Sequence, residues 1–77
     1  QVSFNFENIK LKKAISALVE DHGFLIAYSD QIINPIIEKK CVECSESEVL
    51  DLILLNLNLI FWQMKLNQIN QYKVLEM

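Results

Sequence analysis

The chain has 77 residues, of which 52% are hydrophobic, so it is long enough for one domain and too apolar to be disordered. Its formal net charge of −3 disfavours nucleic-acid binding, and because all of its basic residues are lysines, arginine contacts to bases or phosphates are excluded. No stretch is apolar for long enough to span a bilayer, and a start at Gln1 instead of Met predicts a processed or excised segment.

The first half of the chain predicts a strand, a helix and a second strand. Residues 2–6 alternate apolar and polar side chains, which is the period of a strand with one buried face. An amphipathic helix follows and ends at Gly23, a residue suited to the left-handed backbone that closes a helix. The apolar run from Phe24 to Tyr28 predicts the second strand. The inward stripe of the helix comprises Leu11, Ala14, Ile15, Leu18 and Val19.

The second half follows the same order. A strand is expected from Ile36 or Ile37 to Cys44. Ser45 and Glu48 then match the S-x-x-E capping box that begins a helix. The inward stripe of this helix comprises Val49, Leu50, Ile53, Leu54 and Leu57, whereas Leu52 and Leu55 add apolar surface on other faces. A helix that is apolar on several faces needs cover on several sides.

The two halves are copies of one unit. Val49 lies 35 positions after Ala14, and Asn58 lies 35 positions after Gly23, where it replaces glycine as the left-handed stop. Two further strands, at residues 59–66 and 71–75, are joined by a hairpin turn. The sequence therefore predicts one α+β domain of duplicated β-α-β units, ordered β-α-β-β-α-β-β. Its repeat halves are at about 2–29 and 36–75, and its two helices lie between two small sheets.

These residues resemble a known family. The run from Val2 to Leu11, the segment His22–Ser29 and the run from Ser45 to Leu54 with its terminal hairpin look like the secretin and TonB short N-terminal (STN) domain. The chain departs from the family pattern at two positions. Asn58 stands where the family usually has glycine, and Lys39 stands where an apolar residue is expected.

The resemblance implies a function without catalysis and without a cofactor. It implies a periplasmic signalling domain of an outer-membrane TonB-dependent receptor, of the ferric-citrate-receptor or SusC-like kind, that binds no small-molecule substrate itself. Its implied partner is the periplasmic segment of an inner-membrane anti-sigma regulator, to which the domain reports that the receptor has bound its transported substrate. The same resemblance leaves two other contexts open, namely the N-terminal docking domain of a secretin and the C-terminal domain of an anti-sigma regulator.

Cys41 and Cys44 match the C-x-x-C spacing of thiol-redox and metal sites. A redox cysteine is activated at a helix N-terminus, whereas Cys41 falls on a strand and Ser45 caps the next helix. A zinc site needs two more ligands, and His22 is the only histidine. In the repeat the two cysteines occupy core positions, so we favour buried free thiols over a disulfide, a metal site or a thiol-redox module.

The strand at residues 59–66 is apolar on both faces. If Leu59 and Phe61 continue the core face, then Ile60, Trp62 and Met64 point the other way. Such a second face is either covered by another element or exposed for a partner, and tryptophan is enriched at binding hot spots. These three residues are the predicted partner-binding site. No nucleophile with a neighbouring base and no metal-ligand set is apparent elsewhere.

Overall fold

The computed structural model describes residues 1–77 and has five strands and two helices. In chain order these elements are β1 (Val2–Lys10), α1 (Leu11–His22), β2 (Ile26–Tyr28), β3 (Ile36–Cys44), α2 (Glu46–Leu54), β4 (Leu59–Leu66) and β5 (Ile69–Glu76). Neither helix combines the length and the apolar character needed to cross a membrane.

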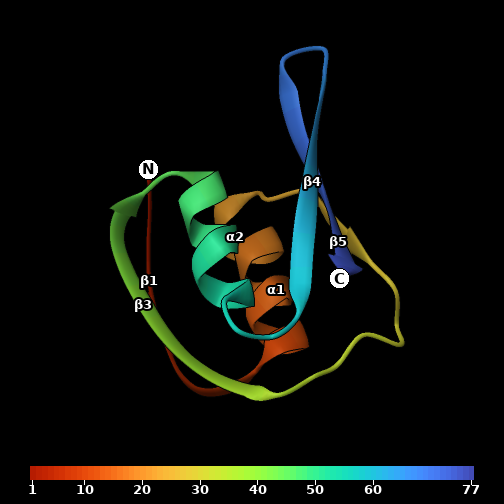
Figure 1. The fold of residues 1–77 in the computed structure, drawn as a ribbon. Helices are drawn as coiled ribbons and strands as arrows, with labels where there is room; N and C mark the ends of the chain where they lie inside the picture. The colour runs from red at the N-terminus through yellow and green to blue at the C-terminus, as the bar shows by residue number, and fades with distance from the viewer.

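The two helices lie between two small sheets, as predicted (Figure 1). One sheet pairs β1 with β3 in antiparallel orientation. The other has the order β2-β5-β4, in which β5 is parallel to β2 and antiparallel to β4. The predicted α+β class is therefore confirmed. Because β5 is the central strand, β4 lies at an edge of its sheet.

Sixteen buried hydrophobic residues form one core, and no polar side chain is buried with them. Eight of the sixteen come from the two helices. Val19 was predicted to face the core, but it is 38% exposed at the margin of the stripe. The buried side chains of the helices are Leu11, Ala14, Ile15 and Leu18 on α1 and Val49, Leu50, Ile53 and Leu54 on α2.

The predicted signals at the end of α1 and at the start of α2 are present. Gly23 has φ 72°, and its amide donates to the Val19 carbonyl at 3.2 Å. At the start of α2, the Glu48 amide donates to the Ser45 hydroxyl at 3.2 Å, and the Ser45 amide donates to the Glu48 carboxylate at 2.8 Å. The bond from the Ser45 backbone amide, and after it the Ser45 hydroxyl, lower the pKa of the Glu48 carboxyl.

α2 ends at Leu54, short of Leu57, and its C-cap is Leu55. Asn58 has the expected left-handed backbone, with φ 58°, but it lies beyond the helix end, so its prediction as the stop of this helix is wrong.

Each half carries a β-bulge just before its helix. Asn8 in β1 and Glu43 in β3 have left-handed backbones, with φ 51° and 52°, and each lies where the register of the β1–β3 pair shifts. The two positions are 35 residues apart, the same offset as in the sequence repeat. The bulge breaks the apolar–polar alternation, so the sequence pattern ended the first strand at Phe6 although β1 continues to Lys10.

Candidate functional site

The outer face of β4 is apolar and uncovered. The three residues predicted to bind a partner, Ile60, Trp62 and Met64, are 38%, 62% and 61% exposed and lie on this face. Leu66 continues their alternation along β4, and Ile69 lies opposite Leu66 on β5. We call these five residues the hairpin patch. The sequence reasoning missed Leu66 and Ile69, although the period of two already pointed to Leu66.

The hairpin projects beyond the helices, which explains why its far end has no cover (Figure 1). Its turn has two residues, Asn67 and Gln68, both with positive φ, as in a type I′ turn. The inner face of this far end is polar, and the Gln63 side-chain amide donates to the Asn70 side chain across the strands at 3.1 Å. The apolar side chains of the projecting hairpin therefore lie on its outer face, beside Gln71 and Lys73 of β5.

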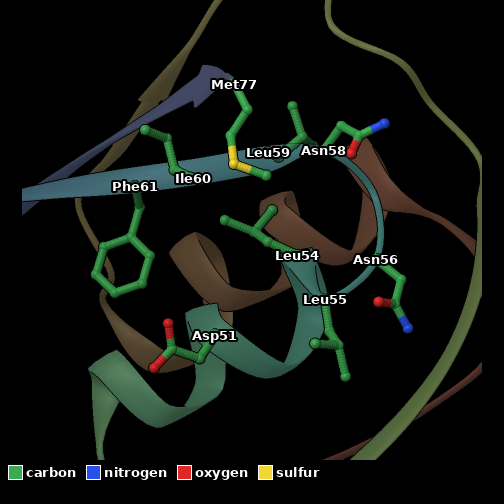
Figure 2. Close-up of a pocket in the computed structure, with 9 residues that line it drawn as sticks. All are labelled: Asp51, Leu54, Leu55, Asn56, Asn58, Leu59, Ile60, Phe61 and Met77. Carbon is green, nitrogen blue, oxygen red and sulfur yellow. The ribbon is translucent and has the colours of Figure 1, made fainter.

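A groove of about 630 Å³ lies beside the other end of β4, near the point where α2 ends (Figure 2). Phe61 points from β4 toward α2, whereas Ile60 points away from it, and Met77 reaches back across the strand. Asp51 supplies the only charged side chain in the wall. The complete lining is Asp51, Leu54, Leu55, Asn56, Asn58, Leu59, Ile60, Phe61 and Met77.

The base of the hairpin is fastened to α2 by a buried tyrosine. Tyr72 of β5 is 4% exposed, and its hydroxyl donates to Oε1 of Glu46 at 2.7 Å. Burial of the ring, followed by the hydrogen bond and the negative charge of Glu46, raises the pKa of the Tyr72 hydroxyl above its ordinary value. The neutral hydroxyl therefore persists as the donor, and it positions the sheet that carries both the hairpin patch and the groove.

Cys41 and Cys44 are joined in a disulfide, so the prediction of two buried free thiols is wrong. Both residues are only half-buried. The bulge at Glu43 is the physical reason, because it brings their Cα atoms to 6.2 Å, within the range that a disulfide spans. The bridge encloses the left-handed residue of the second bulge and lies directly before the capping box of α2.

The remaining ionisable groups do not converge on a chemical site. His22 is exposed in the last turn of α1 and is distant in sequence from Cys41 and Cys44. No group of three or more His, Cys, Asp or Glu side chains is placed to hold a metal ion. Of the basic residues, Lys12 is tied to the loop before β3: its amide donates to Asn34 at 2.8 Å and its ammonium donates to the Asp30 carbonyl.

Comparison of the chain with protein-family models, with curated proteins and with solved structures finds no match.

Proposed function

We propose that this domain binds another protein through the β4–β5 hairpin and has no catalytic role. The observation that carries the proposal is the hairpin patch, a continuous row of apolar side chains that no element of the fold covers. Contiguous exposed apolar surface on a small soluble domain marks an interaction site. Trp62 lies in this row and has the residue type most enriched at hot spots.

We further propose an STN-type role in the periplasm, as part of an outer-membrane TonB-dependent receptor. The partner is then the periplasmic segment of an anti-sigma regulator, and the signal is that the receptor has bound its transported substrate. Two features support this proposal. One is the duplicated β-α-β order with two helices between two sheets. The other is the Cys41–Cys44 disulfide, because disulfides persist in oxidising compartments such as the periplasm.

A titration of the 77-residue chain with the periplasmic segment of the regulator tests the proposal. Trp62 is the only tryptophan, so its fluorescence reports contact directly. We expect saturable binding that is weakened at least tenfold in Trp62→Ala, as is usual for a hot-spot tryptophan. Calorimetry measures this loss, because the variant lacks the fluorophore. Val42→Ala is the matched control, since Val42 is 79% exposed on β3, outside the hairpin patch. Absence of saturable binding by the folded domain would contradict the proposal.

A second candidate function rests on the same disulfide. A C-x-x-C pair that is half-buried and oxidised is compatible with a thiol-redox module. Against this function, the N-cap of α2 is Ser45, which already accepts the amide of Glu48, and Cys44 lies outside the helix. A thiol-exchange assay against a small disulfide decides between them. Rapid exchange by the reduced pair would favour the redox module, and slow exchange would remove it.

A further inference from the structure

The edge of β4 that faces away from β5 offers unpaired backbone groups. The Tyr72 amide donates to the Leu25 carbonyl at 2.9 Å, so the backbone of Tyr72 faces β2. Its neighbours in β5, Gln71 and Lys73, therefore face β4, because the pointing direction alternates along a strand. Their cross-strand partners are Met64 and Trp62, which are consequently the paired residues of β4.

The intervening residues of β4 face the other way. By the same alternation, the N–H and C=O groups of Phe61, Gln63 and Lys65 point to the free edge. No hydrogen bond outside the β4–β5 ladder engages the backbone of these three residues. A row of free donors and acceptors of this kind is a template for an added strand.

The groove lies at this same edge. Its wall includes Ile60 and Met77 from the outer side of β4 and Leu59 and Phe61 from the inner side, and only a position at the rim of the sheet reaches both faces (Figure 2). A strand paired with β4 would send alternate side chains to the two faces. Those on the inner side would enter the groove between β4 and α2, and those on the outer side would extend the hairpin patch.

Charge indicates which segment fits. Asp51 lies in the wall of the groove, and the other charged residues of α2, Glu46 and Glu48, are also acidic. Glu46 and Glu48 lie in the first turn of the helix, where the Tyr72 hydroxyl and the Ser45 amide hold them, so the negative charge in the groove comes from Asp51. At the opposite end of the same edge the charge is reversed, because Lys65 lies there. Charge complementarity therefore favours an incoming strand that carries a basic side chain at the end nearest the groove.

We propose that β4 binds an extended segment of the partner protein by strand addition. The segment places an apolar side chain in the groove and a lysine or arginine beside Asp51. This inference rests on the proposed protein-binding function, and it names the surface and the chemistry of the occupant.

The probe is a displayed library of random octapeptides, selected on the 77-residue chain. We expect the enriched peptides to alternate apolar residues and to carry at least one lysine or arginine. Amide chemical shifts should map their binding to Phe61, Gln63 and Asp51. Selection of no peptide, or of peptides that bind away from β4, would overturn the inference.

Backbone pairing is tested on an enriched peptide, without altering the protein. Alternate amides of the peptide are N-methylated in two frames, so that one frame removes the N–H groups that face β4 and the other removes those that face solvent. We expect the first frame to lose binding at least tenfold and the second to retain it. Equal losses in both frames would show that no strand is added.

The charge term is tested with Asp51→Asn against Glu20→Asn, an exposed carboxylate on α1 that serves as the control. Asp51→Asn should weaken the peptide two- to fivefold, the range of an exposed ion pair, and should leave a peptide with norleucine in place of the basic residue unaffected. An equal loss for both peptides would contradict the assigned contact.

The two proposals fail in different ways. If the regulator segment binds and Trp62→Ala weakens it, while the enriched octapeptide does not compete with it, protein binding stands and strand addition as its mode is excluded. If the regulator does not bind but the octapeptide adds to β4 as described, the partner class of the proposed function is wrong and the strand-addition surface remains.

Discussion

The hydroxyl of Tyr72 lies between two parts of the molecule that are far apart in sequence. Its ring packs against Phe24 and Phe61, with centroid distances of 6.2 and 5.8 Å, and its hydroxyl reaches Glu46 on α2. Nothing in the sequence linked these groups, because Glu46 is 26 positions away from Tyr72. The contact depends on the tertiary structure, in which β5 lies beside α2.

Removal of this hydroxyl should have a pH-dependent effect on stability. Tyr72→Phe is expected to lower the free energy of unfolding by about 1–2 kcal/mol near neutral pH, through loss of a hydrogen bond to a carboxylate. The folded-state pKa of Tyr72 is raised, so this residue's contribution is complete below pH 10, the ordinary tyrosine value, and is lost as pH rises further.

The difference in stability between wild type and Tyr72→Phe should therefore shrink above pH 10. Urea denaturation of both proteins between pH 7 and pH 11 measures this difference, and the titration of the lysines cancels because both proteins contain them. A difference that stays constant to pH 11 would show that the hydroxyl is not held in its neutral form by the fold.

The order and type of every element followed from sequence patterns, and the boundaries differed where the backbone turns left-handed or pairing begins late. The strand predicted from Phe24 begins at Ile26, because Phe24 is used in the core and only three residues of β2 reach β5. The strand predicted from Gln71 begins at Ile69, because the two-residue turn lets the ladder close at once. Hydrophobic periodicity does not report either event.

The hairpin offers a direct test of this turn. Gln68 has φ 67°, a conformation that glycine adopts without steric penalty, so Gln68→Gly should raise the free energy of unfolding by about 0.5–1 kcal/mol. It also produces the Asn-Gly pair favoured in type I′ turns. Urea denaturation measures the change. Gln71→Gly, in the strand itself, is the matched control and should instead lower stability by about 0.5–1 kcal/mol. A loss of stability in Gln68→Gly would mean that the turn has another geometry.

In the candidate site, too, the sequence pattern predicts which residues share a strand face, whereas only the tertiary structure determines their exposure. The period of two placed Ile60, Trp62 and Met64 on one face, and the structure leaves that face exposed. Their exposure could not be predicted, because a second sheet or a helix fits the same pattern. The groove with Asp51 was not foreseen at all, since it depends on β4 being an edge strand beside α2.

At the scale of the whole molecule, the two halves share a bulge before the helix but stabilise it with different residues. Each half passes from a bulged strand into a helix, with Asn8 at the first bulge and Glu43 at the second. Asparagine tolerates a left-handed backbone better than glutamate does. The disulfide that encloses Glu43 has no counterpart in the first half, where Phe6 and Ile9 occupy the equivalent positions. We infer that the disulfide stabilises the bulge at Glu43, because glutamate favours the left-handed backbone less than Asn8 does in the first half.

Reduction of this disulfide should therefore loosen one bulge and leave the fold in place. The bridge spans a sequence separation of only 3, for which the loss of chain entropy gives about 2 kcal/mol of stabilisation. Neither cysteine is among the sixteen core residues and only Cys44 packs against them, so most of the core packing does not involve the bond. We expect urea denaturation with and without reductant to differ by about that amount and to remain cooperative. A Cys41→Ser, Cys44→Ser double variant, in which reductant has no target, is the control. Complete unfolding on reduction at neutral pH would show instead that the bridge, and not the core, determines whether this small domain folds.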